Sequence, residues 1–283
     1  MRSVVITGAS TGIGWATAKL LLTRGFRVFG SVRKPADADR LKSEFGANFT
    51  PLLFDVTDEA AVLAAAREVR AVLGGETLAG LVNNAGVAVA GPVLELSVDD
   101  FRRQMEINVI GPVIATQAFA PLLGADRSLK GKPGRIVMIS SVAGRTGNPL
   151  SAPYSASKHA IEGLSESLRR ELMLFGIDVI VIAPGAVKTP IWSKGDEVDF
   201  SKYQNSLYLP ALQQVRKFTK YLSEIGLPAE KIAEAIADAL TSAHPRVRYS
   251  ITPDPMRHLI TAMLPKRVVD KIIAKRLGLL PPA

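Results

Sequence analysis

Short apolar runs rich in β-branched residues alternate with longer helical patterns along most of this chain. The runs cover residues 4–7, 27–32, 49–54, 78–82, 135–140 and 177–182. Most of them lack the polar–apolar alternation of a half-exposed strand, which is typical of strands that are buried on both faces of a parallel sheet. Because successive parallel strands are joined by right-handed crossovers, the alternation predicts an α/β fold with a doubly wound sheet and helices on both faces.

Helical patterns fill the gaps between these runs. They cover residues 13–24, 36–45, 58–73, 99–123 and 154–175, and a further helix at 228–242 precedes a short strand near 247–251. Thr57 or Asp58 suits the start of the third helix, the stretch 98–100 suits the start of the fourth, and Gly176 suits the end of the fifth. With 283 residues, the chain is long enough to form one large domain over 1–283.

The composition excludes several kinds of chemistry and limits the kinds of partner. The chain has no cysteine, which excludes disulfides, thiolate catalysis and cysteine-bound metal, and its three histidines do not form a ligand set. The sequence Met1-Arg2-Ser3 runs directly into the first strand without a secretory signal, and no apolar run could span a bilayer, so we expect a cytoplasmic protein. The net charge of +9 fits nucleic acid, an anionic membrane surface or a phosphate-bearing cofactor. No aromatic–basic motif accompanies the charge, and we expect no nucleic-acid partner.

The pattern changes after Pro190. Residues 190–226 are rich in aromatics and lack a strand pattern, and we expect them to form a substrate lid, although the aromatics could equally be ordinary packing. Residues 252–283 predict a helical tail that is interrupted at Pro265. This tail is basic and amphipathic and could lie on an anionic membrane. A terminal helix of this kind more often covers the substrate region or a subunit contact, so the sequence favours no membrane contact.

A glycine-rich turn follows the first predicted strand. It reads Thr7-Gly8-Ala9-Ser10-Thr11-Gly12-Ile13-Gly14 and opens directly into a helix. Glycines allow the backbone to approach a pyrophosphate, and the helix N-terminus offers free N–H donors and the positive end of its dipole. The turn alone is weak evidence, but its place at the first strand–helix turn of an alternating chain predicts a dinucleotide site.

The end of the second strand distinguishes between the two nicotinamide cofactors. An acidic residue there would accept the ribose 2′-hydroxyl of NAD, whereas a basic residue suits the 2′-phosphate of NADP. This chain has Ser31-Val32-Arg33-Lys34 with no carboxylate. A guanidinium offers phosphate a planar fork of donors, and the pair Arg33 and Lys34 therefore predicts NADP(H) in preference to NAD(H), unless it is only a solvated strand end.

Tyr154 and Lys158 stand four residues apart in a predicted helix, so their side chains share one face. A phenol has an ordinary pKa of about 10, and lowering it by about 3 units requires about 4 kcal/mol of preferential stabilisation of the phenolate. A neighbouring ammonium and an oxidised nicotinamide could supply this stabilisation. Such a pair also occurs by chance in many helices, and further motifs are needed to assign a role to it.

Those further motifs occur in one order along the chain. The turn at 7–14 has the pattern TGxxxGxG, Asp55-Val56 closes the third strand, and Asn83-Asn84-Ala85-Gly86 closes the fourth. Ser141 lies thirteen residues before Tyr154, and Pro184-Gly185-Ala186-Val187-Lys188-Thr189 follows the sixth strand. Together with Asn108, these motifs resemble the classical short-chain dehydrogenase/reductase family over roughly residues 3–189. The resemblance implies one Rossmann-type sheet of about seven strands in the order 3-2-1-4-5-6-7.

The same resemblance implies a role for each motif. Asn108, Ser141, Tyr154 and Lys158 would be the catalytic residues: Ser141 binds the substrate oxygen, and Asn108 distorts its helix and holds a water that leads to Lys158. Ser140 is the competitor of Ser141, but strand alternation would turn it to the opposite face. The expected cofactor-binding residues are Gly8, Ser10, Thr11, Gly12, Ile13, Gly14, Arg33, Lys34, Asp55, Val56, Asn83, Asn84, Ala85, Gly86, Tyr154, Lys158, Pro184, Gly185, Val187 and Thr189.

These expectations combine into an NADP(H)-dependent oxidoreductase that interconverts a ketone or aldehyde and an alcohol without a metal. The stretches 28–33 and 244–249 resemble, more loosely, the 17-beta-hydroxysteroid and retinol dehydrogenase-like branch, which implies a lipophilic substrate. Two alternatives are an idle NADP-binding regulatory protein and an NAD-dependent alcohol dehydrogenase for a small substrate. The family resemblance also implies a homodimer or homotetramer that forms through the helices at 99–123 and 154–175.

Overall fold

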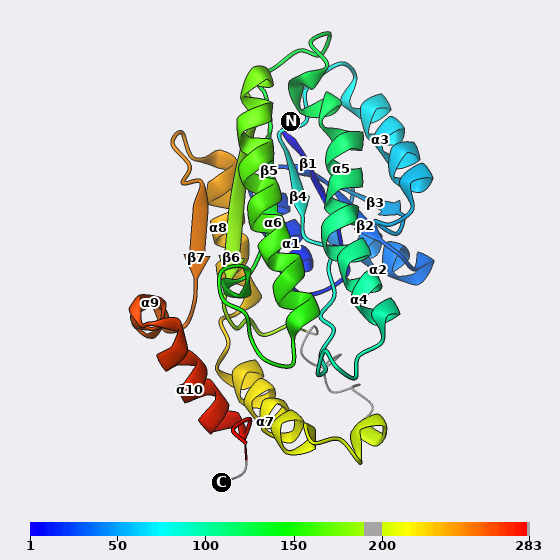
Figure 1. Ribbon diagram of the computed structural model, residues 1–283. Helices are drawn as coiled ribbons and strands as arrows, with labels where there is room; N and C mark the ends of the chain where they lie inside the picture. The colour runs from blue at the N-terminus through cyan, green and yellow to red at the C-terminus, as the bar shows by residue number, and fades with distance from the viewer. Residues whose placement is uncertain (190–199, 282–283) are drawn as a thin grey trace.

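Seven parallel strands form a single sheet in the order β3-β2-β1-β4-β5-β6-β7 (Figure 1), which confirms the predicted fold class. The structure is a computed structural model and describes residues 1–189 and 200–281. The strands are β1 (Ser3–Ile6), β2 (Arg27–Val32), β3 (Phe49–Leu53), β4 (Gly80–Asn83), β5 (Arg135–Ile139), β6 (Asp178–Pro184) and β7 (Arg248–Ile251). The chain reverses its direction of travel across the sheet at β1, which pairs with both β2 and β4, and ligands bind at such a switch point.

Helices cover both faces of the sheet, as Figure 1 shows. The helices α3 (Glu59–Leu73), α5 (Gly111–Phe119) and α6 (Ala152–Glu171) pack on one face. On the other face lie α1 (Gly12–Thr23), α2 (Pro35–Phe45) and α8 (Ala229–Thr241). Each strand therefore needs apolar side chains in both directions, which explains why its sequence is apolar at nearly every position.

Alternate residues of β1 show this double burial. Val4 and Ile6 belong to the core that faces α1 and α8, whereas Val5 belongs to the core that faces α3 and α5. All three side chains are completely buried. A shift of one residue in strand register would exchange the two faces, so the packing fixes the register and with it the position of the turn that follows β1.

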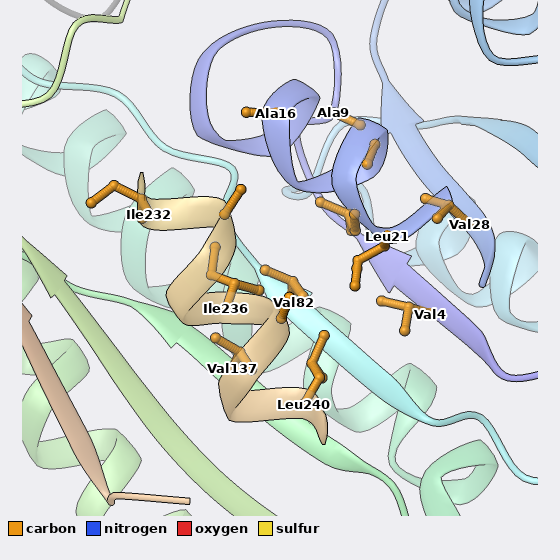
Figure 2. Packing of buried hydrophobic residues seen from close by; sticks show 14 of the residues in the cluster. Val4, Ala9, Ala16, Leu21, Val28, Val82, Val137, Ile232, Ile236 and Leu240 are labelled. Atoms are coloured by element: carbon orange, nitrogen blue, oxygen red, sulfur yellow. The ribbon is translucent and has the colours of Figure 1, made fainter. Parts of the chain in front are cut away.

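The helix α1 packs closely against α8. Ala16 and Leu21 of α1 face Ile232, Ile236 and Leu240 of α8 across the core shown in Figure 2. Small side chains on α1 allow the two helices to approach closely, and burial of the apolar residues of α8 fixes the axis of α1 beneath the glycine turn. The helix that presents its N-terminus to the switch point therefore has a rigid support.

The predicted helix at 99–123 is not one regular helix. It consists of α4 (Val98–Met105), a π-helical turn η1 (Glu106–Ile110), α5 and a second π-helical turn η2 (Pro121–Ala125). Its N-cap is Ser97, whose hydroxyl accepts a hydrogen bond from the backbone N–H of Asp100, and not a residue of 98–100. Asp58 caps α3 and Gly176 ends the segment after α6 in the left-handed conformation, as predicted.

The segment 200–225 and the tail after β7 lie beyond the carboxyl ends of the strands (Figure 1). Of the predicted lid, residues 190–199 lie outside the described residues, and the remainder forms a short 3₁₀ turn η6 (Phe200–Tyr203) and α7 (Leu209–Ile225), a helix that the sequence analysis did not predict. The tail forms α9 (Pro255–Met263) and α10 (Lys266–Leu277), with the break at Pro265 as predicted. Within the described ranges, none of the helices is long and apolar enough to cross a membrane.

Candidate active site

A cleft of about 360 Å³ opens at the carboxyl ends of the strands, beside the switch point at β1. The glycine turn, the ends of β2 to β6 and the first turns of α6 line it. Ser31 at the end of β2 accepts a hydrogen bond from the backbone N–H of Gly8 at 2.9 Å, and Arg40 of α2 donates to the backbone oxygen of Ser10 at 2.8 Å. The turn is therefore held from two sides before any ligand binds.

The glycine turn has the properties of a phosphate cradle. A Cβ atom on Gly14 would lie 2.2 Å from the backbone oxygen of Gly8, so only glycine fits there. The first turn of α1 contains no acidic residue, and the N-cap residue Thr11 makes no side-chain hydrogen bond to it. The helix N-terminus therefore keeps its N–H donors and its positive dipole for an anion, and these residues fit the pyrophosphate of a nicotinamide dinucleotide.

Asn84 joins the turn to the end of β4. Its side-chain amide donates to the backbone oxygens of Thr7 at 2.9 Å and Gly8 at 3.0 Å. The hydroxyl of Thr7 in return accepts hydrogen bonds from the backbone N–H groups of Asn84 and Ala85. Asn83 points elsewhere and donates to Thr116 inside the core. Of these two asparagines, Asn84 shapes the cleft and Asn83 secures the sheet.

Arg33 and Lys34 do not share one environment. Arg33 lines the cleft, is 57% exposed and forms an ion pair with Asp55 at 3.6 Å. Burial would raise the pKa of Asp55, but hydrogen bonds from Thr57 and the charge of Arg33 lower it below its ordinary value. Lys34 is the N-cap of α2 and lies outside the lining of the cleft. Arg33 is therefore the basic residue of this pair that is positioned to meet a 2′-phosphate.

Tyr154 lies in the first turn of α6, and the side chain of Ser141 lies close enough to its hydroxyl to lower the pKa of the phenol. Ser141 is the N-cap of a short 3₁₀ turn that follows β5, and its hydroxyl accepts a hydrogen bond from the backbone N–H of Ala143 at 3.1 Å. The hydroxyl of Ser140 is buried without a hydrogen-bond partner among the described residues. Two hydroxyl groups thus meet in the cleft, and Ser141 supplies one of them.

The ammonium of Lys158 is almost completely buried below Tyr154. It donates to the backbone oxygen of Ile139 at 2.8 Å and lies 5.7 Å from the centre of the Tyr154 ring. Burial lowers the pKa of Lys158 from 10.5 to about 8, and the charge of Glu162 opposes this change. A cation thus lies beside the phenol, as the spacing of four residues predicted.

The pKa of Tyr154 differs from the sequence-based expectation. In the chain alone it is raised and not lowered, because burial outweighs the hydrogen bond with Ser141. The phenol is therefore protonated at neutral pH, which suits a group that donates a proton to a carbonyl oxygen. The expected lowering concerns the chain with oxidised nicotinamide bound, and for that state it stays a prediction.

Asn108 lies inside the π-helical turn η1, which matches the expectation that this asparagine distorts its helix. Its side-chain amide donates to the backbone oxygen of Val87 at 3.0 Å and to the hydroxyl of Ser157 at 3.1 Å, and its carbonyl accepts from the N–H of Val87. Gln104, one turn earlier, holds Val87 and Val89 in the same way. Asn108 therefore connects the loop after β4 to α6, the helix that carries Tyr154 and Lys158.

Most of the predicted site residues line one cleft. Gly8, Ser10, Thr11, Gly12, Ile13, Arg33, Asp55, Val56, Asn84, Ala85, Gly86, Ser141, Tyr154, Lys158, Pro184, Gly185, Val187 and Thr189 line it. Gly14, Lys34, Asn83 and Asn108 lie outside its lining. Sequence reasoning did not assign roles to Ser31, Arg40 and Gln104, because each acts by holding the backbone of another segment.

A buried ion pair behind the site was also missed. Arg248 of β7 donates through Nε to both carboxylate oxygens of Glu162 on α6, at 2.9 and 3.2 Å. Both side chains are more than four-fifths buried, and Glu162 lies one helical turn after Lys158. The pair fixes the last strand of the sheet to the catalytic helix. These residues are 86 positions apart, and no local pattern indicates that they meet.

The fold and the cleft define a nicotinamide-nucleotide-dependent oxidoreductase that acts on CH–OH and C=O groups. The family model described as short chain dehydrogenase matches residues 2–198. The chain belongs to the short-chain dehydrogenase/reductase family, as its motifs indicated, and its ligands are a nicotinamide dinucleotide and a small-molecule substrate.

Similar proteins cover nearly the whole chain. An NADPH-dependent 3-dehydrocapnine reductase from Ornithobacterium rhinotracheale is 40% identical over 98% of this chain and 98% of its own length. Retinol dehydrogenase 5 from Homo sapiens is 33% identical over 95% of this chain and 87% of its own length. A solved short-chain dehydrogenase/reductase from Burkholderia phymatum in complex with NAD superposes with a TM-score of 0.78 at 25% identity and covers 96% of this chain and 95% of that one.

Proposed function

We propose that this protein is an NADP(H)-dependent reductase and alcohol dehydrogenase for a lipophilic ketone or aldehyde. The observation that carries the proposal is that Tyr154 and Ser141 line the same cleft, with the Lys158 ammonium beside the phenol ring. Two hydroxyl groups that converge on one point can both hydrogen-bond a substrate oxygen, and one of them can transfer a proton to it.

Each residue has a distinct part in this proposal. The bound nicotinamide supplies or accepts the hydride. In the reductive direction Ser141 and Tyr154 donate hydrogen bonds to the carbonyl oxygen, and Tyr154 transfers its proton as that oxygen gains negative charge. The ammonium of Lys158 stabilises the resulting phenolate, and water held near Asn108 leads a proton back to the site. In the oxidative direction the same groups act in reverse.

We propose NADP(H) as the cofactor because the positive charge of Arg33 suits the 2′-phosphate. Arg33 lies at the end of β2 in the lining of the cleft, and its only carboxylate partner among the described residues is Asp55. That exposed pair is weak, and a 2′-phosphate could share or replace it. The similar reductase from Ornithobacterium rhinotracheale carries NADPH dependence in its name, which supports the same choice.

A lipophilic substrate is supported by apolar side chains in the lining of the cleft. Val87, Ala88, Val89 and Ile107 contribute to this lining, together with the charged residue Arg103. The whole-length similarity to a 3-dehydrocapnine reductase and to a retinol dehydrogenase points in the same direction. We further propose a homodimer or homotetramer that forms through α4, α5 and α6, which lie side by side on one face of the sheet (Figure 1).

The decisive experiment follows NADPH oxidation with a panel of long-chain ketones, steroids, retinoids and aryl ketones. We expect turnover by the natural chain and a loss of at least about 100-fold with Tyr154→Phe, because the proton donor is removed. Binding of NADPH, measured by fluorescence titration, should stay unchanged in this variant. Turnover that survives Tyr154→Phe would contradict the proposed role, and NADPH binding without turnover on any substrate would favour the idle regulatory protein.

A further inference from the structure

The helices α9 and α10 and the turn between them expose apolar side chains that the other described residues do not cover. These are Met256, Ile260, Met263, Leu264, Val268 and Ile272, which are 38 to 79% exposed. On α9, Met256, Ile260 and Met263 follow the spacing i, i+4, i+7 and therefore share one face. On α10, Val268 and Ile272 are one turn apart. We call these six residues the tail surface.

The opposite side of α10 faces the protein. Leu277 packs against the small apolar cluster around Leu212 of α7. Arg276, one turn after Ile272, extends to α7 at the end of the helix, where its guanidinium lies 4.8 Å from the centre of the Phe218 ring. These contacts fix the rotation of α10 about its axis. Because Val268 and Ile272 lie on the side turned away from Leu277, their exposure is a consequence of how the helix is docked.

Positive charge borders the apolar residues of α10. Arg267, Lys271 and Lys275 repeat at steps of four and therefore form a second row beside Val268 and Ile272. All three are exposed, and Asp270, the one acidic residue of α10, is turned toward the Leu277 side. The outward half of the helix thus combines two apolar residues with three cations and no carboxylate.

The combination of apolar side chains and cations indicates which kind of partner this surface binds. A second copy of the chain that met this surface across a twofold axis would bring the rows of Arg267, Lys271 and Lys275 together, and the like charges would repel. Nucleic acid would pair with the cations but would leave the apolar residues in contact with water. An anionic lipid surface accepts both, because acyl chains cover the apolar side chains while lysine and arginine reach the headgroups.

We propose that the tail surface binds the protein peripherally to membranes that contain anionic lipid. The proposal rests on α9 and α10 alone and does not depend on the reaction in the cleft. The helices lie in the plane of the lipid surface and do not cross it, since neither is long enough to span a bilayer.

The test is sedimentation of the intact protein with vesicles of phosphatidylcholine alone and of phosphatidylcholine mixed with phosphatidylglycerol. We expect binding to the mixed vesicles, little binding to pure phosphatidylcholine, and release at high salt. Each lysine removed should weaken binding about fivefold, so Lys271→Gln with Lys275→Gln should weaken it by more than about 20-fold. Ile272→Asp should also abolish most of the binding.

Matched controls lie at the amino ends of the strands, whereas α9 and α10 lie beyond the carboxyl ends. Lys130→Gln with Lys132→Gln removes two exposed charges before β5, and Leu174→Asp changes an exposed apolar residue before β6. Both should bind vesicles as the natural chain does. Absence of binding to the mixed vesicles, or equal losses in the control variants, would overturn the proposal. A change from dimer to monomer in Ile272→Asp with vesicle binding unaltered would also overturn it, in favour of a second copy.

Discussion

The hydroxyl of Ser31 accepts a hydrogen bond from the backbone N–H of Gly8, and so the second strand holds the turn that follows the first. Ser31 is almost completely buried. Ser31→Ala should leave the N–H of Gly8 without a partner, lower the free energy of unfolding by about 1–3 kcal/mol and weaken NADPH binding. Urea unfolding and fluorescence titration measure the two effects. Ser223 on α7 is partly exposed and its hydroxyl donates only to the backbone oxygen of Lys220 in the same helix, so Ser223→Ala should change stability by less than about 0.5 kcal/mol.

Replacement by alanine should have opposite effects on stability at two helical glycines, Gly14 and Gly163. In Gly14→Ala the new Cβ would lie 2.2 Å from the oxygen of Gly8 and 2.6 Å from the amide nitrogen of Asn84, so the turn must shift. We expect a loss of about 1–3 kcal/mol in stability together with a large loss of cofactor affinity. Gly163→Ala on α6 meets no atom within 4 Å and should stabilise the protein by about 0.5–1 kcal/mol. Thermal unfolding of both variants tests the pair, and equal shifts would contradict this packing.

Arg33 should determine the preference for NADPH. Arg33→Gln removes hydrogen bonds to a charged group, and we expect the KM for NADPH to rise about 10- to 100-fold while the KM for NADH changes little. Lys34→Gln is the matched control, because Lys34 lies outside the lining of the cleft. Comparable effects of both substitutions would indicate a general effect of charge, and no effect of Arg33→Gln would remove this residue from the 2′-phosphate site.

Burial of Lys158 should make stability depend on pH. The pKa of its ammonium is about 8 in the folded chain, against 10.5 ordinarily, so the folded chain binds fewer protons than the unfolded chain between these values. Stability therefore rises with pH through this window, by up to about 3 kcal/mol. Lys158→Met lacks this contribution. Urea unfolding from about pH 7 to about pH 9.5 measures the free energy of unfolding of the natural chain and of Lys158→Met. The difference between the two should change with pH, so that their profiles converge or cross. Parallel profiles would contradict the lowered pKa of Lys158.

Much of the fold could be predicted from the sequence because local residue patterns determine the strands, the helices and their ends. The strand run at 27–32 coincides with β2, and Pro265 marks the break between α9 and α10. The π-helical turn around Asn108 could not be placed by helical periodicity, since one additional residue in a turn changes the pattern only slightly. The helix α7 was missed because the aromatic residues around it suggested irregular packing against a ligand.

The candidate site also combines features that local sequence patterns predict with features that depend on the complete fold. Tyr154 and Lys158 could be paired because four residues in a helix fix their relative positions. Strand alternation did not separate Ser141 from Ser140, because β5 ends at Ile139 and both serines line the cleft. The link between Glu162 and Arg248 depends on how β7 pairs with β6, which only the complete sheet determines. The raised pKa of Tyr154 was missed for a related reason, since the extent of burial is a property of the assembled cleft.

The packing of α1 on α8 has a consequence for how the protein matures on the ribosome. α1 ends at Thr23 and α8 begins at Ala229, so the nucleotide cradle is synthesised long before the helix that supports it. A nascent chain that has been translated only as far as β6 still exposes the apolar side of α1. Completion of the cradle is therefore a late folding event, and an early translational stop would yield an aggregation-prone fragment and not a small nucleotide-binding domain.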